Sequence, residues 1–497
     1  MKTSLSKQVK WVLAISLRLA LALVIVWFTI ILLYASQARK KGDLKLWHRI
    51  RLKSEFKAKD FNDKFIFSDY QKMENDLFNE LHEKVYQNIA QADKHQFNRY
   101  NLKSPCNPDN FKQNFNRSYE LVPEKVAGGI LLIHGLTDSP YSMKHLARLF
   151  YDKGFYVLIM RMPGHGTVPS ELANINRQDW TAAVKVGAKH VTEFTGQGKP
   201  FYIAGYSNGA LLALQYTFES IENDQLTKPD NLFLFSPSLG VTKFAALSKW
   251  FKALSFIPYF EKSNWKSISP EYDPFKYTSF PMNASKQLYD LSMQTQKQLL
   301  IHQQEGTLDK LPPVTTFQSV VDSTVITEDI IYKLYANLPV KGHELILFDV
   351  NRNSYLQNFL KSNHSLFLSD LSKPEKLPYN LTIVTNKDVD SVEVVAKTKK
   401  QNSTEFISTD LGLSWPKQIY SLSHIAIVFP PDDALYGITP STDTGLHLGN
   451  IELKGERNLL KIPAGDLMRL RCNPFFDYMT ERISKLILQG NSEIYKD

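Results

Sequence analysis

Short apolar runs separated by helical stretches fill the chain from about residue 121 to its end. The runs are GGILLIHG (128–135), GFYVLIMRM (154–162), PFYIAGYS (200–207), NLFLFSP (231–237), VTTFQSVVD (314–322) and ELILFDV (344–350). Continuous apolar strands that alternate with helices are typical of a parallel sheet covered on both faces. Right-handed crossovers place the carboxyl ends of such strands along one edge, where a functional site is expected. The pattern predicts an α/β fold over residues 121–497.

Two spacings between these runs are too long for simple crossovers. Residues 238–310 are rich in aromatic side chains and predict an inserted cap, with a purely structural helical insert as the alternative. Residues 351–417 form a second insertion with two strand-like stretches, YNLTIVTN and VEVVAKTKK. Long insertions above the active edge of a sheet are often lids or functional additions.

The amino terminus has a different pattern. From Trp11 to Ala35 the only charged residue is Arg18. About 20 apolar residues suffice to span a bilayer as a helix, so residues 1–35 predict a transmembrane anchor. The alternative is a cleaved signal peptide, although its apolar core is usually only about 7–15 residues long.

The side of the membrane on which the body lies stays open. Basic residues follow the apolar stretch more densely than they precede it, which favours a cytoplasmic body. Against this, Cys106 and Cys472 are the only two cysteines and would suit a disulfide in an oxidising compartment. Two unpaired, buried thiols fit the sequence equally well.

The charge distribution argues against a nucleic-acid-binding protein. The formal net charge is +9. The first 60 residues hold nine Lys and four Arg against three acidic residues, which leaves the rest of the chain close to neutral. Residues 36–120 are polar and charged, with helical stretches such as Tyr70 to Ala90, and predict a stalk or charged helical extension. A neutral body lacks the basic face that nucleic-acid binding requires.

One short motif introduces chemistry. Gly205-Tyr206-Ser207-Asn208-Gly209 follows an apolar strand and precedes a helical pattern. Glycines two residues before and two residues after a serine allow the sharp strand-to-helix turn known as a nucleophile elbow. The motif predicts that Ser207 is a nucleophile.

A serine hydroxyl needs a base and an orienting acid. In this topology both follow the serine in the chain, the acid first, each at the carboxyl end of a strand. Asp322 closes the run VTTFQSVVD, with Asp329 and Asp349 as alternatives. His424 lies beyond the last predicted strand and is the candidate base. Its rivals are His343, His364 and His447.

An oxyanion needs two preorganised backbone N–H donors. One candidate is the N–H of Asn208, which follows the nucleophile. The other is the N–H of Leu136, in the loop after the strand GGILLIHG. Gly135 allows a close backbone approach there, and His134 at the strand tip is expected to fix the loop through a structural hydrogen bond.

These motifs together resemble the α/β-hydrolases of the serine aminopeptidase and monoacylglycerol lipase type, in a bacterial branch. HGLTDSPYSM resembles the oxyanion loop of that family, RMPGHG its R-x-x-G-H-G turn, GYSNGA its elbow and FQSVVDSTV its acid loop. The resemblance implies that Ser207, His424 and Asp322 form a catalytic triad that acts through an acyl-enzyme, with no metal or cofactor. It also implies a single-pass protein of a bacterial inner membrane.

The resemblance does not fix a substrate. An apolar cap and a bilayer anchor favour a serine hydrolase of carboxylic or lipid-like esters. A peptidase is the first alternative and needs an acidic pocket, to which Asp432, Asp433 and Glu271 could contribute. The second alternative is a noncatalytic, hydrolase-like scaffold. The separation of Asp322 from His424 by the second insertion is the main departure from the family pattern.

Overall fold

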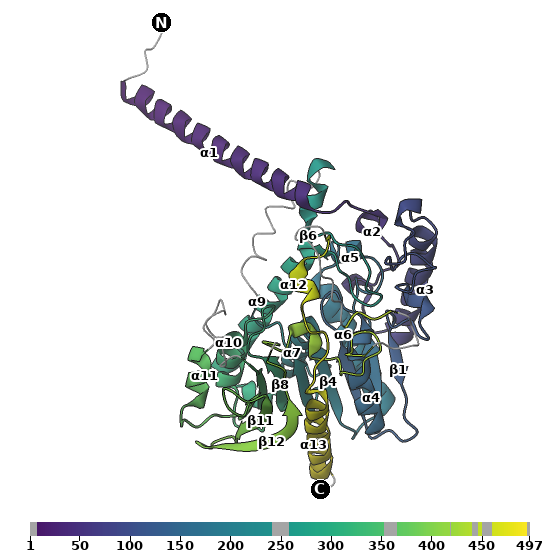
Figure 1. The fold of residues 1–497 in the computed structure, drawn as a ribbon, viewed down its shortest axis with the longest axis vertical. Coiled ribbons are helices and arrows are strands. Elements are labelled where there is room, and N and C mark those ends of the chain that lie inside the picture. Colours follow the sequence, from purple (N-terminus) through teal and green to yellow (C-terminus); the bar gives the residue numbers. More distant parts are fainter. Residues whose placement is uncertain are drawn as a thin grey trace.

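The computed structural model describes residues 7–240, 258–351, 365–417, 419–439, 446–449 and 460–494. A long helix, α1 (Lys7–Lys40), projects from a body in which helices surround a large sheet (Figure 1). Residues 241–257 of the predicted cap and 352–364 of the second insertion lie outside the described residues, and so does the candidate base His364.

The main sheet has ten strands in the order β1-β3-β2-β4-β5-β8-β9-β10-β11-β12. The pairings from β3 through β10 are all parallel, whereas β1, β11 and β12 pair antiparallel at the two ends. The strands are β1 (Tyr119–Leu121), β2 (Gly128–Ile133), β3 (Phe155–Met160), β4 (Phe201–Tyr206), β5 (Asn231–Phe235), β8 (Val314–Ser319), β9 (Glu344–Asp349), β10 (Asn380–Asn386), β11 (Glu393–Lys399) and β12 (Phe406–Ser414). The predicted, mostly parallel α/β sheet is confirmed.

Each central strand contributes side chains to two hydrophobic cores, because successive side chains point to opposite faces of a sheet. In β2, Leu131 and Ile133 join one core, and Ile130 and Leu132 join the other. Burial on both faces explains why these strands are apolar throughout rather than alternating.

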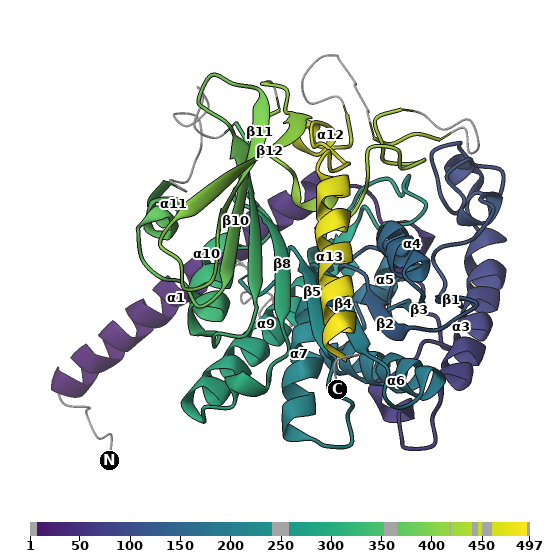
Figure 2. The ribbon, with the colours of Figure 1, turned by 90° about the horizontal axis from the view of Figure 1, so that it is seen from below.

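Helices cover both faces of the sheet (Figure 2). Residues of α6, α7 and α9 line the core on one face, and residues of α4 and α13 line the core on the other. The α-helices of four or more residues that the structure describes after β1 are α4 (Lys144–Asp152), α5 (Pro169–Leu172), α6 (Arg177–Thr195), α7 (Asn208–Glu222), α9 (Met282–Gln304), α11 (Ser365–Ser372), α12 (Ala464–Leu467) and α13 (Phe476–Ile494).

The segment between α1 and the sheet is not a stalk, so that part of the prediction is wrong. It contains α2 (Leu46–Arg49) and α3 (Phe67–Leu81), and a π-helical turn (His82–Tyr86) continues α3. Phe56, Phe67 and Tyr70 belong to the same core as α6 and α7. The polar composition of the segment gave no sign of these buried aromatic side chains, because a few large buried side chains suffice to hold an otherwise charged segment against the body.

The two predicted insertions have different structures. From the first, the described residues form a 3-10 helix (Pro258–Asn264), the two-stranded β6 (Trp265–Ser267) and β7 (Phe280–Pro281), and α9, which packs on α6 and α7. From the second, β10, β11 and β12 extend the main sheet beyond β9. The second insertion therefore widens the sheet.

Helix α1 contains one stretch, Trp11–Thr29, that is long and apolar enough to cross a membrane, and none of it is buried against the rest of the protein. A signal sequence near an amino terminus can pass the same test of length and composition. Cys106 and Cys472 are both buried and free, so the two do not form a disulfide.

Candidate active site

Ser207 lies at the turn between β4 and α7, at the carboxyl edge of the sheet. Its backbone has φ 56° and ψ −111°, a conformation that L-residues rarely adopt. Two backbone hydrogen bonds hold it there: the Ser207 N–H donates to the Phe235 carbonyl at 2.8 Å, and the Ser238 N–H donates to the Ser207 carbonyl at 3.2 Å. Strand β5 and the residues after it therefore fix the strained serine in place.

The two glycines of the elbow have no room for a side chain. A Cβ on Gly205 would lie 2.3 Å from the carbonyl carbon of Gly209, and a Cβ on Gly209 would lie 2.1 Å from the Ile133 oxygen. Both contacts are with backbone, which cannot move aside without breaking the turn or strand β2. The spacing of the motif is thus required by the close approach of β2, β4 and α7.

The three residues predicted as nucleophile, base and acid are in hydrogen-bond contact. Ser207 Oγ lies 3.1 Å from His424 Nε2, and His424 Nδ1 lies 2.7 Å from Asp322 Oδ2. All three side chains are buried, with exposed fractions of 7%, 5% and 9% for Ser207, His424 and Asp322. Ser207 lies in the turn after β4, Asp322 in the loop after β8, and His424 at the start of a short 3-10 helix (His424–Ala426).

The described alternatives to His424 and Asp322 have other partners. His343 Nδ1 accepts a hydrogen bond from the Val314 N–H, and His447 Nε2 donates to the Gly437 carbonyl. Asp329 pairs with Lys333 on the surface. Asp349 closes β9, one strand beyond the loop that carries Asp322.

The surroundings of Asp322 favour its charged form. Burial opposes ionisation, but the neighbouring His424 and the backbone N–H groups of Thr324 and Val325 outweigh it, so the pKa of Asp322 is held below its ordinary value. The two N–H groups donate to Oδ1 at 2.7 and 3.1 Å, whereas Oδ2 accepts from the imidazole at 2.7 Å and from Gln318 Nε2 at 3.2 Å. Asp322 can therefore hold His424 in the tautomer with hydrogen on Nδ1 and a free Nε2 facing the serine.

Asn351 explains how a long insertion can separate the acid from the base. It lies two residues after the end of β9, at the start of the insertion, and its side-chain Nδ2 donates to the carbonyls of Pro416 and Ile419, at 2.7 and 2.8 Å. The insertion therefore begins and ends at neighbouring positions in the fold, because the Asn351 side chain at its start is hydrogen-bonded to two residues at its end. The loop that carries His424 resumes where it would begin if β10–β12 were absent.

The loop after β2 places the other predicted oxyanion donor. Leu136 is followed by Thr137, whose φ of 69° turns the chain sharply, and the Tyr277 N–H donates to the Thr137 carbonyl at 2.8 Å. Within the described residues, neither Leu136 nor Asn208 is a donor in the backbone hydrogen bonds of the turns and loops. Both N–H groups are thus available to an acceptor outside the backbone.

His134 has only backbone partners. Its Nε2 accepts from the Met162 N–H at 2.9 Å, and its Nδ1 donates to the Gly135 carbonyl, also at 2.9 Å. Burial, together with the nearby His165, lowers the pKa of His134 well below its ordinary value, so the ring is neutral. His134 therefore joins the oxyanion loop to the turn Arg161–Gly166, in agreement with the structural role expected for it.

Sequence reasoning missed a buried charge cluster beneath that turn. Arg161 is 1% exposed and makes a bidentate pair with Glu55, at 2.9 and 3.0 Å, and a second ion pair with Glu74 at 2.9 Å. Glu55 also accepts from the Gly164 N–H at 2.8 Å. Both acids lie in a charged segment, where no local pattern distinguishes a buried carboxylate from an exposed one.

Asp433 is a second residue whose place sequence reasoning misjudged. It is fully buried and accepts hydrogen bonds from Tyr141 and from the Tyr436 N–H, and pairs with Lys144 and His145 at 2.9 and 2.7 Å. Burial opposes its ionisation, but His145 and Lys144 outweigh this and lower the pKa of Asp433. The cluster joins the loop after His424 to the start of α4, which follows the oxyanion loop.

The acidic pocket that a peptidase needs is not formed by the suggested residues. The Asp433 carboxylate is occupied by the hydrogen bonds and ion pairs that it makes within the protein. Glu271 is 1% exposed and accepts from the Thr278 and Ser279 N–H groups at 3.1 and 2.8 Å. Asp432 is exposed, in the loop beyond the base.

The family model described as serine aminopeptidase, S33, matches residues 124–329. This segment is similar to that family of α/β-hydrolases. It includes the elbow, the oxyanion loop and Asp322, and it ends before His424.

A curated relative of the S33 segment is a thermostable monoacylglycerol lipase of Bacillus sp. (strain H-257), 33% identical over 86 residues. The match covers 17% of this chain and about a third, 33%, of the length of that lipase. Over part of its length, the chain therefore resembles a lipase and the α/β-hydrolases of that family.

Solved structures also resemble the chain. One, from a study of the metagenome-derived lipolytic enzymes LipS and LipT, is 23% identical and covers 47% of this chain and 87% of its own, with a TM-score of 0.36. The monoacylglycerol lipase of Paleococcus ferrophilus is 17% identical and covers 46% of this chain and 87% of its own, with the same TM-score of 0.36.

Proposed function

We propose that this protein is a membrane-anchored serine hydrolase that cleaves carboxylic esters, including lipid-like esters, through an acyl-enzyme. The observation that carries the proposal is the unbroken chain of hydrogen bonds from Ser207 through His424 to Asp322. A serine hydroxyl becomes a strong nucleophile only when a base can accept its proton as it attacks.

The proposed mechanism gives each group a step. His424 Nε2 accepts the proton of Ser207 as Oγ attacks the ester carbonyl, and ionised Asp322 stabilises the imidazolium that results. The N–H groups of Leu136 and Asn208 donate to the oxyanion of the tetrahedral intermediate. His424 then returns the proton to the leaving alcohol, and water activated by the same imidazole releases the acid.

Ester rather than peptide hydrolysis is supported by the fate of the acidic residues. Asp433 and Glu271 are satisfied inside the fold and are not free to bind a substrate's amino terminus. The relatedness of the segment to a monoacylglycerol lipase points the same way. Membrane anchoring is supported by the apolar, unburied stretch Trp11–Thr29 and the basic residues around it.

A fluorophosphonate probe tests the enzymatic part. We expect the full chain in a neutral detergent to be labelled at Ser207, and Ser207→Ala to lose both labelling and turnover of p-nitrophenyl esters. Ser238 is the matched control, since its Oγ lies 3.1 Å from Ser207 Oγ. Labelling that persists in Ser207→Ala but disappears in Ser238→Ala would reverse the assignment, and a folded protein that is never labelled would exclude a serine hydrolase.

Alkaline carbonate extraction and intact mass test the anchor. The full chain should stay in the membrane pellet with its amino terminus uncleaved, and a chain that begins at Lys41 should be soluble. Release of the full chain by carbonate, or a mass that lacks the apolar stretch, contradicts the anchor and leaves the esterase assignment unaffected.

A further inference from the structure

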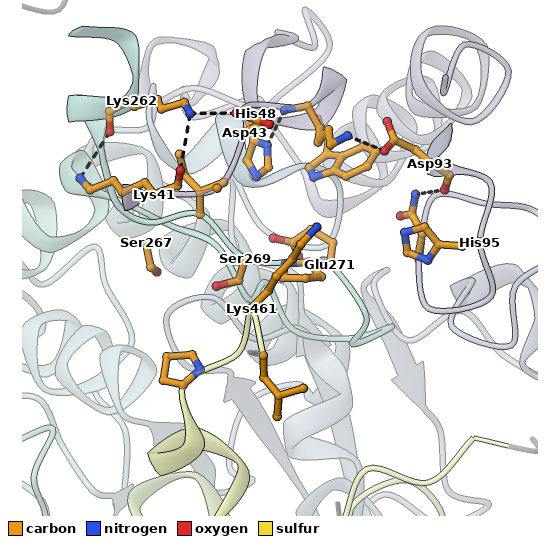
Figure 3. A pocket seen from close by; sticks show the side chains of 18 of the residues that line it. Lys41, Asp43, His48, Asp93, His95, Lys262, Ser267, Ser269, Glu271 and Lys461 are labelled. Atoms are coloured by element: carbon orange, nitrogen blue, oxygen red, sulfur yellow. Dashed lines mark hydrogen bonds and ion pairs between the residues drawn. The ribbon is translucent and has the colours of Figure 1, made fainter. Parts of the chain in front are cut away.

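A cavity of about 810 Å³ lies at the foot of α1. Its wall begins at Lys41, the residue after the end of the helix. Lysines reach the cavity from three segments: Lys41 follows α1, Lys262 lies in the 3-10 helix before β6, and Lys461 precedes α12 (Figure 3). Ser207 and His424 do not line it, so this cavity is separate from the candidate active site.

The cavity carries more positive charge than its acids neutralise. Three of its five lysines have partners. Lys45 pairs with Asp93 at 2.7 Å and Lys262 pairs with Asp43 at 2.9 Å, whereas Lys41 donates to backbone carbonyls of the β6 region.

The other two lysines of the wall, Lys266 and Lys461, are exposed and have no carboxylate within ion-pair distance among the described residues. The carboxylate of Glu271, the third acid of the wall, accepts hydrogen bonds from the Thr278 and Ser279 N–H groups. An anion that entered the cavity would therefore meet two ammonium groups that no carboxylate contacts directly, although Asp43 interacts electrostatically with Lys461, and Lys266 Nζ lies 5.6 Å from the centre of the Phe280 ring.

A buried donor in the same wall also lacks an acceptor. Trp47 lines the cavity and is 4% exposed, and its Nε1 has no hydrogen-bond partner within the part of the chain that the structure describes. Buried N–H groups in proteins are nearly always satisfied, so a donor left over in a cavity wall indicates a ligand atom. His48 beside it is neutral, because burial and then the nearby Arg49 and Lys45 lower its pKa to about 3.

The position of the cavity selects among possible anions. It lies at the foot of α1, the helix that carries the membrane-crossing candidate, six residues beyond the apolar stretch that ends at Ala35 and thus on the water side of the lipid headgroups. Basic residues next to a membrane span attract anionic lipids, and pockets of this kind hold phosphate headgroups. Trp47, Ile268 and Leu460 add apolar wall, which suits a ligand with a glycerol and acyl portion as well as a phosphate.

We propose that this cavity binds the phosphate group of an anionic phospholipid, with Lys266 and Lys461 as its charged contacts and Trp47 Nε1 as a neutral donor. The proposal rests on the membrane anchoring put forward above. It does not depend on ester hydrolysis.

Native mass spectrometry of the delipidated full chain in a neutral detergent tests the site. Dioleoylphosphatidylglycerol and dioleoylphosphatidylcholine are titrated separately, and the retained lipid is counted. We expect saturable retention of phosphatidylglycerol and weaker retention of phosphatidylcholine. The double variant Lys266→Gln/Lys461→Gln should lower the affinity for phosphatidylglycerol by about tenfold or more, because each basic contact with an anionic lipid is worth roughly fivefold. Trp47→Phe should lower it by a smaller factor.

The double variant Lys153→Gln/Lys199→Gln is the control, since both lysines are exposed at the opposite, amino-terminal edge of the sheet. It should bind like the wild type. Equal retention of the two lipids, or equal loss in the two double variants, overturns the proposal. Competition by an equal concentration of inorganic phosphate overturns the lipid assignment in favour of a free-phosphate site.

Ester turnover separates this test from the test of function. Turnover of p-nitrophenyl butyrate should be unchanged in all of these variants. Absence of turnover in the wild-type protein would contradict the proposed esterase function. Absence of selectivity between the two lipids would contradict the proposed lipid site in the cavity.

Discussion

At the scale of single residues, Asp322 decides which proton His424 carries. With Oδ1 occupied by two backbone N–H groups, Oδ2 is the acceptor that faces the imidazole. An amide at this position can present its NH₂ group to Nδ1 and stabilise the tautomer that has hydrogen on Nε2, which cannot accept the serine proton.

Asp322→Asn should therefore lower kcat on p-nitrophenyl butyrate by about 10³ to 10⁴, with KM little changed. Asp329→Asn is the control, since Asp329 lies a few residues away in a surface ion pair with Lys333. Steady-state kinetics with circular dichroism to verify folding measures both. A kcat within tenfold of the wild type for Asp322→Asn contradicts its role.

Residues with a local signal could be predicted from the sequence. Ser207 was identified by glycines at fixed spacing, and Asp322 by its place at the end of an apolar run. Glu55 and Ser238 could not be predicted, because they reach Arg161 and Ser207 through contacts between segments far apart in the chain. Such contacts leave no trace in the spacing of neighbouring residues.

At the scale of elements, the second insertion depends on Asn351. Asn351 has φ 55°, and its Nδ2 bridges the two carbonyls where the chain returns. Its Oδ1 accepts from Asn386 Nδ2 at 3.0 Å, at the end of β10. We call these hydrogen bonds of the Asn351 side chain the clasp.

Asn351→Asp should retain the backbone conformation and place a carboxylate oxygen against the two carbonyls. We expect a loss of about 1–3 kcal/mol in the free energy of unfolding, and a lower kcat because the His424 loop is displaced. Asn402→Asp is the matched control at another residue of positive φ, exposed in the turn between β11 and β12. Urea unfolding and kinetics of both variants decide the matter, and identical behaviour of the two contradicts the clasp.

The buried strands of the sheet could be predicted because apolar residues fill them, and the predicted runs agree with β2, β3, β4, β5, β8 and β9 within two residues at their starts. The outer strand β12 could not, because most of its side chains are exposed and its pattern resembles that of a loop. The sequence also gave no sign that β10 pairs with β9, since strand order depends on contacts between separate segments.

At the scale of the whole molecule, the segment before the sheet is part of the hydrolase body. Glu55 and Glu74 neutralise Arg161, which lies beneath the turn that contacts His134. Replacing Glu55 by an amide exchanges its charge-assisted, bidentate pair for weaker hydrogen bonds, while Glu74 still balances the charge of Arg161.

Glu55→Gln should therefore lower the free energy of unfolding by about 1–3 kcal/mol. Glu83→Gln, an exposed acid at the end of the same segment, should leave it unchanged. Thermal and urea unfolding of the full chain in detergent compares the two. A Glu55→Gln protein as stable as the control would show that the segment is docked by its apolar side chains alone.

Acid should destabilise the fold well above the pKa range of carboxylates. Burial lowers the pKa of His48 to about 3, and of His165 and His343 to about 4, against 6.5 for an unperturbed histidine. Below pH 6.5 the unfolded chain binds protons that these folded histidines refuse, so stability falls with falling pH. Burial raises the pKa of Glu171 to about 7, which opposes one of the three.

The net effect between pH 6.5 and about 4 is a loss of stability as the pH falls, since these histidines, together with the buried His134, take up more protons on unfolding than Glu171 releases. The urea midpoint of the full chain should fall steadily from pH 7 to pH 5. A midpoint that is constant over this interval contradicts neutral, buried histidines.

The docked amino-terminal segment has a mechanical consequence for an anchored enzyme. No slack chain separates the end of α1 from the core: Leu44, Trp47 and Leu52 are already buried within a few residues of the helix. An enzyme built this way keeps a constant height and tilt above the lipid surface, and it meets new substrate by drifting sideways within the bilayer rather than by swinging on a leash.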